Sequence, residues 1–559
     1  TETVDAYGRV VFTYSAFSNV IPRYHAGSLS ETQERLDKIS VQVEKEGEST
    51  WTDVREYALT YDEGLTVPSS GMARLTKVQH CAPTTSGTCG EATTFDWQAE
   101  IGDFSLSTWT GHGVATTHSL NQWADMDGDG MADYISSDSA SSTHVVSLSS
   151  GSSFSTSNWT AHAVGSEGFE SLGDMNGDGL TDYVTIDTDG TQYVSISTGT
   201  GYVTAASWNG ATPGDHNFIL DLDGDGRSDY LTSTGTSYSV NISTGSAYGS
   251  DESWSGPDLG TIIGSSTQSF SFQDMDKDGL PDIVVTDSTN DEITIYLNEG
   301  DDFDAGSAFD IHTSHEVDGH WVDMNGDGYR DYVTVPSSGT TQYVSLWTGD
   351  FGSSTNGFDS STWTGVAVGT SGIQAFHDMN GDGLADFITA DNTGGTDGEY
   401  SIMMSKGTGY VASAVVWDGP VFTGTTGQHH FADIDGDGKI DVAMLETDGD
   451  VRVGISDCQP IHLMTLITDG LGNEIEIDYK PTTDTTVHTQ LSDATYPQID
   501  IANASHVVSQ VTQPDGIGGD AVQNYSYTGF KFERGGRGSL GFKEVEVEYV
   551  NQKPRSVPT

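Results

Sequence analysis

A nine-residue acidic pattern constrains the fold of this chain more than any other feature. It reads D-x-[DN]-x-D-G-x-x-D and occurs seven times, with first residues Asp125, Asp174, Asp221, Asp274, Asp323, Asp378 and Asp433. Carboxylates at alternate positions of a tight loop converge on one point and repel each other unless a cation binds between them. Oxygen ligands at positions 1, 3 and 5, a carbonyl at position 7 and a Gly at position 6 are typical of a calcium loop. The pattern predicts one Ca²⁺ per copy, about seven in all.

The ninth residue, always Asp, completes the expected ligand shell. The predicted ligands, with position 7 acting through its carbonyl, are Asp125, Asp127, Asp129, Met131 and Asp133; Asp174, Asn176, Asp178, Leu180 and Asp182; Asp221, Asp223, Asp225, Arg227 and Asp229; Asp274, Asp276, Asp278, Leu280 and Asp282; Asp323, Asn325, Asp327, Tyr329 and Asp331; Asp378, Asn380, Asp382, Leu384 and Asp386; and Asp433, Asp435, Asp437, Lys439 and Asp441. We expect rigid structural clips rather than sensors, because the pattern shows no helix pair that could open.

The spacing of the loops predicts the fold around them. Successive first aspartates lie 49, 47, 53, 49, 55 and 55 residues apart by subtraction, which is the period of a propeller blade. A Trp precedes most loops, and β-favouring runs such as Tyr183-Val184 follow them. We therefore expect each repeat to be four strands: one around the Trp, one entering the loop, one leaving it and one ending in Ser-Thr-Gly or similar. The prediction is an all-β, seven-bladed β-propeller; a calcium solenoid would have a much shorter period.

The flanks divide the chain further. Residues 1–100 are interpreted as an N-terminal β-rich domain, residues 101–457 as the propeller and residues 458–559 as a C-terminal β-rich domain. Expected strands in the first part span 9–15, 36–43, 57–61, 74–80 and 94–97. Residues 30–38 are the one short helix candidate, and residues 466–479 read as a hairpin.

Charge and cysteine usage favour a secreted or cell-surface protein. The formal net charge is −62, and seven bound Ca²⁺ would bring it to about −48. So acidic a surface argues against nucleic acid or an anionic membrane as partner, and no apolar run is long enough to cross a bilayer. Cys81 and Cys89 have a spacing that suits a disulfide across a hairpin, which leaves Cys458 as a free thiol. Because the sequence begins at Thr1 without Met or signal peptide, we expect a processed or excised product.

The repeats and both flanks resemble a known family. The D-x-[DN]-G-D-G repeats resemble FG-GAP (VCBS-type) calcium-binding propeller repeats. Residues 35–97, with Arg74-Leu75-Thr76-Lys77-Val78-Gln79-His80-Cys81, resemble the segment before the propeller in SpvB-like proteins, which include the TcdB-like B components of insecticidal toxin complexes. Residues 468–545, with Asp515-Gly516-Ile517-Gly518-Gly519 and Gly538-Ser539-Leu540-Gly541-Phe542, resemble the segment after it.

The resemblance implies a protein that assembles with others. In that family the propeller is followed by Rhs/YD repeats that form a shell around a toxic cargo, and it docks onto a translocation channel and gates release. Here Tyr61-Asp62-Glu63-Gly64 is a lone YD-like fragment, so gating is expected only if this chain is one piece of a longer, Rhs-type polypeptide. The resulting hypothesis is a non-catalytic binding or assembly module with a protein partner or self-assembly.

Two other functions remain open at this stage. One is a surface adhesin, a lectin that binds a surface glycan, or a fibre subunit; the other is a propeller-type polysaccharide lyase. Candidate catalytic groups are poor. The segment His315–His320 has one residue too many for H-E-x-x-H, Glu474 and Glu476 resemble the E-x-E of an ADP-ribosylating toxin without its other motifs, and His377, His429 and His430 adjoin calcium loops, where packing is the expected role. We predict no catalytic residue.

Overall fold

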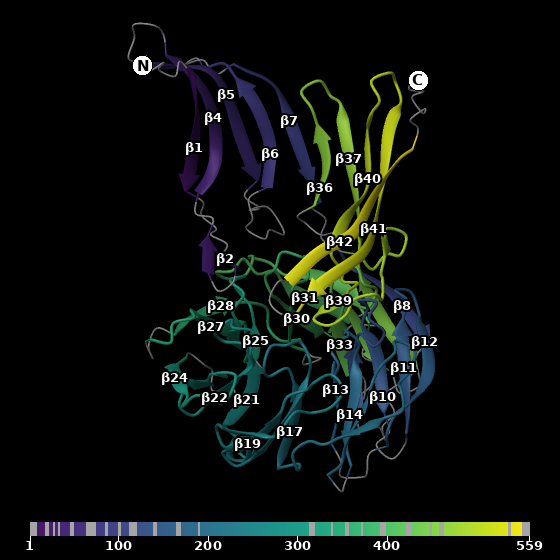
Figure 1. The fold of residues 1–559 in the computed structure, drawn as a ribbon. Coiled ribbons are helices and arrows are strands. Elements are labelled where there is room, and N and C mark those ends of the chain that lie inside the picture. The colour runs from purple at the N-terminus through teal and green to yellow at the C-terminus, as the bar shows by residue number, and fades with distance from the viewer. Residues whose placement is uncertain are drawn as a thin grey trace, which may run out of the picture.

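The computed structural model describes residues 8–16, 22–25, 28–31, 34–44, 50–62, 74–83, 88–98, 102–110, 120–137, 142–163, 169–187, 190–311, 319–336, 339–352, 357–369, 373–391, 398–420, 428–445, 450–457, 463–534 and 538–550 (Figure 1). Nearly all regular structure in these residues is strand, as the sequence predicts. None of their helices is long and apolar enough to cross a membrane. Cys458 and the segment 312–318, which holds most of the H-E-x-x-H-like motif, lie outside the described residues.

Seven antiparallel four-stranded sheets form a β-propeller. Numbered in chain order, the blades are: blade 1, β9 (Leu120–Ala124), β10 (Asp133–Ser137), β11 (Thr143–Ser149), β12 (Phe154–Thr160); blade 2, β13 (Phe169–Gly173), β14 (Asp182–Ile186), β15 (Gln192–Ser195), β16 (Ala206–Trp208); blade 3, β17 (His216–Leu220), β18 (Asp229–Thr234), β19 (Ser237–Asn241), β20 (Glu252–Ser255); blade 4, β21 (Gln268–Gln273), β22 (Asp282–Asp287), β23 (Glu292–Tyr296), β24 (Ser307–Asp310); blade 5, β25 (His320–Val322), β26 (Asp331–Thr334), β27 (Thr341–Trp347), β28 (Phe358–Thr364); blade 6, β29 (Ala375–His377), β30 (Asp386–Asp391), β31 (Gly398–Met403), β32 (Val415–Gly419); and blade 7, β33 (Gln428–Ala432), β34 (Asp441–Leu445), β35 (Asp450–Ser456) and β8 (Phe104–Thr110).

The structural blade is offset by one strand from the sequence repeat. The sequence analysis placed the Trp strand first in each unit, but that strand is the last of the preceding blade: Trp159 lies on β12 and pairs with His144 of β11. The first Trp strand, β8, has no preceding blade and completes blade 7, where Trp109 pairs with Val451. This arrangement closes the ring with backbone hydrogen bonds between the two ends of the propeller sequence, so no blade has only three strands.

The propeller core forms between neighbouring blades. The residues at the Trp positions are all at most 5% exposed. They are Trp109, Trp159, Trp208, Trp254, Phe309, Trp363 and Trp417. The second residue of every calcium-type loop is 0% exposed, namely Met126, Met175, Leu222, Met275, Met324, Met379 and Ile434. Met126 shares a cluster with Ile135, Val146 and Trp159. Each loop is therefore anchored in the core through its apolar second residue.

The two flanks form one sheet instead of two separate domains. Its strand order is β1 (Gly8–Ala16), β4 (Glu34–Glu44), β5 (Trp51–Asp62), β6 (Arg74–Cys81), β7 (Cys89–Trp97), β36 (Met464–Thr468), β37 (Glu474–Pro481), β40 (His506–Pro514), β41 (Asp520–Glu533) and β38 (His488–Thr489), while β39 (Gln498–Asp500) and β42 (Gly538–Tyr549) also pair with β41. The junction is the pairing of Trp97 on β7 with Met464 on β36. The propeller is thus inserted between two neighbouring strands of a sheet that stands over it (Figure 1).

The predicted helix at residues 30–38 is wrong. Residues Ser28–Glu31 form β3, which pairs with β2 (Pro22–His25), and Glu34–Glu44 form β4. Ile39, Val41 and Val43 recur at every second residue, and β4 has strand partners on both sides, so tertiary pairing overrides the local helical preference. The α-helix in the described part of the chain is α1 (Leu259–Ile263), where the Asp258 side chain accepts the Thr261 N–H.

Candidate metal centres

Each calcium-type loop connects the first and second strands of one blade. In blade 1 the loop runs from Asp125 to Asp133, between β9 and β10. Gly128 and Gly130 have φ of 79° and 86°, a left-handed conformation that lets the chain turn tightly around the carboxylates. In blade 4 the first of these two positions is Lys277, which adopts φ of 64° without being glycine.

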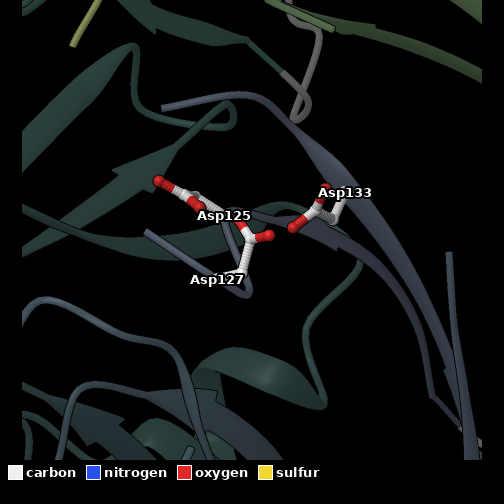
Figure 2. A group of neighbouring side chains, drawn as sticks. All are labelled: Asp125, Asp127 and Asp133. Atoms are coloured by element: carbon white, nitrogen blue, oxygen red, sulfur yellow. The ribbon is translucent and has the colours of Figure 1, made fainter. Parts of the chain in front are cut away.

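The carboxylates converge as the pattern predicts. In four loops, three carboxylates each offer an oxygen within 4.8 Å of the others: Asp125, Asp127 and Asp133; Asp221, Asp223 and Asp225; Asp274, Asp276 and Asp282; Asp433, Asp435 and Asp441. Figure 2 shows the first of these groups, with the side chains of Asp127 and Asp133 facing each other across a short gap. The donor set is entirely oxygen, which suits a hard divalent cation such as Ca²⁺.

The loops of blades 2, 5 and 6 have Asn in the third position and hence one carboxylate fewer. In blade 2, the Asn176 side-chain amide donates to Asp178 Oδ2 at 2.9 Å and its carbonyl oxygen accepts the Asp178 N–H at 2.8 Å. Asn325 makes the same two contacts with Asp327. Asn380 instead places its amide nitrogen 3.7 Å from Met404 Sδ. These loops keep the backbone path while reducing the charge.

The first Asp of each loop organises the turn. Asp125 Oδ1 accepts the Gly128 N–H at 2.7 Å, and its Oδ2 accepts the Gly130 N–H at 2.9 Å. The residue at position 7, whose carbonyl is a predicted ligand, donates its N–H to the fifth residue: Met131 to Asp129 Oδ1 at 2.9 Å, for example. The carbonyl ligands remain predictions.

The ninth Asp also accepts backbone hydrogen bonds that the sequence pattern does not predict. Asp133 is 0% exposed; its Oδ2 accepts the Met126 N–H at 2.8 Å and its Oδ1 accepts the Ser149 N–H at 2.7 Å. All seven loops repeat this bridge from loop to third strand, through Asp182, Asp229, Asp282, Asp331, Asp386 and Asp441. The ninth residue therefore joins the loop to the third strand of its own blade.

A further contact joins six of the seven loops to the next blade. Ser197 of blade 2 donates its hydroxyl to the Met126 carbonyl of blade 1 at 3.2 Å. Ser149, Ser243 and Ser405 make the equivalent bond, and Asn298 and Trp347 replace the hydroxyl with a side-chain N–H. The sequence signal was the Ser, Asn or Trp two residues before a Gly at the end of the third strand, as in Ser197-Thr198-Gly199.

Burial makes these carboxyl groups hard to ionise without a cation. Burial raises the pKa of Asp133, Asp182, Asp229 and Asp441 to about 8, and that of Asp282 to about 7. The same cause raises the pKa of Asp331 and Asp386 well above 3.8. Burial, with neighbouring carboxylates second, raises the pKa of Asp129 to about 6 and of Asp435 to about 7. A bound divalent cation would reverse this preference by stabilising the charged form.

Several basic side chains lie against the loops. Arg227 pairs with Asp225, and Lys439 pairs with Asp437, in each case within one loop. Lys277 of the blade 4 loop donates to the Asp327 carbonyl of the blade 5 loop. Arg534, from the end of β41, places a guanidinium nitrogen 2.9 Å from Asp174 Oδ2.

The other residues singled out from sequence have structural surroundings. His377 packs against Phe431 and His430 against Trp123, with ring centroids 5.3 and 5.7 Å apart. Burial lowers the pKa of His377 to about 4. Glu474 and Glu476 lie on one exposed face of β37. Cys81 and Cys89 form a disulfide between β6 and β7.

Two family models match segments of the chain. The insecticide toxin TcdB middle/N-terminal region matches residues 404–553, and the FG-GAP-like repeat matches residues 174–272 and 274–334. No curated protein matches the chain.

Solved toxin structures share the fold. A chain of the Photorhabdus luminescens Tc holotoxin pore is 15% identical, with a TM-score of 0.62 over 98% of this chain and 25% of that one. The TcdB2–TccC3–Cdc42 structure is 14% identical, with a TM-score of 0.53 over 99% of this chain and 26% of that one. The chain thus spans about a quarter of the length of these relatives. The resemblance to TcdB-like toxin components is confirmed: residues 404–553 match the TcdB middle/N-terminal region, and part of the seven-bladed propeller matches FG-GAP-like repeats.

Proposed function

We propose that this chain is a calcium-stabilised propeller that acts as a non-catalytic assembly module of a secreted, TcdB-like protein. The observation that carries the proposal is the loop arrangement. Four loops gather three carboxylates each, every loop joins its own blade through the ninth Asp, and most loops are bonded to the next blade through a Ser, Asn or Trp side chain. A cation bound there would stabilise the contacts between the loop, its own blade and the next blade.

Calcium fits these loops better than other common metals. The predicted ligands are carboxylate, amide and backbone oxygens, with neither Cys nor His among them, and they sit on a loop whose glycines permit a wide, flexible shell. The ion would neutralise carboxylates that burial otherwise keeps protonated. Because it binds the folded loop, its binding free energy adds to the stability of the propeller.

An assembly role follows the family likeness, which favours a structural component over an enzyme. The solved relatives include TcdB2 in complex with TccC3, and we propose a protein partner for this chain as well. The acidic surface, with net charge −62, suits a partner surface that is neutral or basic. Gating of a translocation channel and continuation into an Rhs-type shell belong to the same proposal.

Metal counting and native size test the proposal together. Protein dialysed against Ca²⁺ and then metal-free buffer should retain about seven Ca²⁺ per 59.5 kDa chain by elemental analysis, and Mg²⁺ should not replace them. In extracts of the native source, an antibody to the propeller should detect a species larger than this chain that also contains a second protein. Chains that carry no calcium would overturn the metal assignment, and a species of 59.5 kDa alone would overturn the assembly role.

A further inference from the structure

The C-terminal part of the sheet is seated directly on calcium-type loops. We name residues 482–506 together with Arg534 the docking segment. Thr483 donates its hydroxyl to the Gly436 carbonyl of blade 7, and Gln490 donates its amide to the Gly128 carbonyl of blade 1 at 2.9 Å. Tyr496 donates its hydroxyl to the Asp225 carbonyl of blade 3 at 3.0 Å. These three hydrogen bonds are made to backbone carbonyls of the loops, not to the blade strands.

The sixth-position glycines make close approach possible. A Cβ added at Gly130 would lie 2.4 Å from the Ala502 carbonyl oxygen, and one at Gly438 would lie 2.9 Å from the Ala504 carbonyl oxygen. At Gly226 it would lie 2.2 Å from Arg534 Cδ. Glycine is therefore required here for packing against the docking segment as well as for its positive φ.

Arg534 touches a predicted metal ligand of blade 2. Its guanidinium lies 2.9 Å from Asp174 Oδ2, and the two side chains are 19% and 16% exposed. The same Oδ2 accepts the Gly179 N–H at 2.9 Å. A mostly buried, charge-assisted contact of this kind is strong and directional. The contact occupies one carboxylate oxygen of Asp174, the first predicted ligand of the loop, with a cationic side chain from another part of the chain.

The blade 2 loop already has the smaller charge. Its ligand side chains are Asp174, Asn176, Asp178 and Asp182, with three carboxylates where the blade 1 loop has four. With every carboxylate ionised, as in a cation-bound loop, the formal side-chain charge is −4 in blade 1, and −3 + 1 = −2 in blade 2 once the Arg534 guanidinium is counted. Arg227 and Lys439 reduce the charge of other loops too, but each belongs to the loop that it contacts. Arg534 differs because it directly follows β41 of the sheet and contacts a loop of the propeller.

Ions can reach the blade 2 loop while the docking segment is in place. A cavity of about 830 Å³ lies between the loops of blades 1 and 2 and residues 490–500. Its walls include Asp127, Asn176, Asp178, Tyr496 and Asp500. A hydrated divalent cation in this cavity would meet the Asp178 carboxylate of the blade 2 loop.

We propose that the Arg534 guanidinium occupies part of the cation site of the blade 2 loop. Ca²⁺ binding at this loop and packing of the docking segment onto the loops (its seating) then oppose each other. This inference rests on the proposed calcium binding of the loops. Ca²⁺ and Arg534 both bind the Asp174 carboxylate, so Ca²⁺ at blade 2 weakens the Arg534–Asp174 ion pair. By linkage, the packed docking segment lowers the Ca²⁺ affinity of the loop by the same factor. The blade 2 loop is then a calcium-responsive contact between propeller and sheet, while the blade 1 loop remains a structural site.

Hydrogen exchange resolved by peptide tests the coupling in the whole chain. During a Ca²⁺ titration, protection of residues 174–182 reports blade 2, protection of 125–133 reports blade 1, and exchange of 490–500 reports seating. In the unaltered protein we expect blade 2 to become protected at roughly tenfold higher Ca²⁺ than blade 1, with faster exchange at 490–500 over the same range. Arg534→Gln should move the blade 2 midpoint down toward that of blade 1, and Arg534→Lys should restore the higher one.

Lys38→Gln is the matched control, because Lys38 pairs with Glu56 between β4 and β5 of the same sheet, outside the docking segment, and is 38% exposed. It should leave both midpoints unchanged. Equal midpoints in the unaltered protein, or an Arg534→Gln variant whose blade 2 midpoint does not move, would overturn the coupling while leaving calcium binding intact. Absence of protection at both loops would instead overturn the proposed calcium function. Asp174→Asn should speed exchange at 490–500 without calcium, which checks the contact independently of metal affinity.

Discussion

The propeller and the sheet above it are built from similar strands but bury them differently. All five residues of β14 and of β34 are buried. In β4, at the other end of the molecule, one residue of eleven is buried, and Val10, Phe12 and Tyr14 of the edge strand β1 are each more than half exposed. The propeller packs the second strand of its blades between neighbouring blades, whereas the described part of the sheet relies mainly on backbone pairing within one layer.

This difference assigns stability to different sources. In the propeller, apolar burial contributes roughly 25 cal/mol per Å² and the loops add cation-dependent junctions. In the sheet, half-exposed side chains contribute less, and hydrogen bonds and the Cys81–Cys89 disulfide hold the strands. The two regions should therefore respond differently to metal, to pH and to truncation of aromatic side chains. The predictions below test that separation.

Chelation should have the largest effect and should act on the propeller. Each site occupied at 100 times its Kd contributes about 2.7 kcal/mol to the free energy of unfolding, so loss of several sites should lower the propeller melting temperature by more than 10 °C. Calorimetry with EDTA and with Ca²⁺-saturated EDTA measures the shift, and hydrogen exchange locates it. Equal loss of protection in β4–β6 and in the blades would show that the two regions are not separate in stability.

The pH dependence of the metal-free protein should have opposite signs in the two regions. In the propeller, the folded pKa of the ninth Asp is raised by burial, to about 8 in four blades, above its ordinary 3.8. The folded state then holds more protons than the unfolded state between these values, so stability falls as pH rises from about 4 to 8. Calcium should remove this loss and release protons on binding.

In the sheet the sign is reversed. Hydrogen bonds from Lys531 and Lys543 lower the pKa of Asp493 to about 2. Its contribution is present above pH 4 and is lost as pH falls toward 2. Region-resolved exchange in EDTA at pH 5 and pH 8 measures the propeller effect, and a pH 2–4 series measures that of the sheet. Greater protection of the metal-free blades at pH 8 than at pH 5 would contradict the burial argument.

Truncating an aromatic residue should expose the packing difference. Trp159 is 2% exposed between blades 1 and 2, so Trp159→Ala should cost about 3–5 kcal/mol in the free energy of unfolding. Phe12 is 51% exposed on β1, and Phe12→Ala is the matched control, with an expected cost below about 1 kcal/mol. Denaturant unfolding in saturating Ca²⁺ compares them. Similar costs would mean that a further layer covers the sheet.

Sequence reasoning succeeds in the propeller because its signals are local. The D-x-[DN]-x-D-G spacing, the apolar second residue such as Met126 and the recurring Trp all lie within one repeat and predict the loops and the core. The strand offset was missed, although a spare Trp strand before the first loop, around Trp109, already implied ring closure with the last blade.

The remaining features depend on contacts between distant segments. Nothing near Trp97 or Met464 indicates that they pair across the inserted propeller. The Arg534–Asp174 contact joins β41 to a loop with which it shares no pattern. The helix prediction at residues 30–38 failed for the same reason, since strand partners outside the window decided the conformation of β4.

The smallest expected effect concerns the junction between blades. Ser197 is 3% exposed and its hydroxyl satisfies the buried Met126 carbonyl, so Ser197→Ala should cost about 1 kcal/mol and raise exchange in both blade 1 and blade 2. Ser150→Ala is the control, because its hydroxyl bonds the Ser153 carbonyl at an exposed turn within one blade. A response confined to blade 2 would mean that the hydroxyl stabilises only its own strand. A response in both blades, with β4–β6 unchanged, would show that stability passes from blade to blade through the loops while the single-layer sheet takes no part in it.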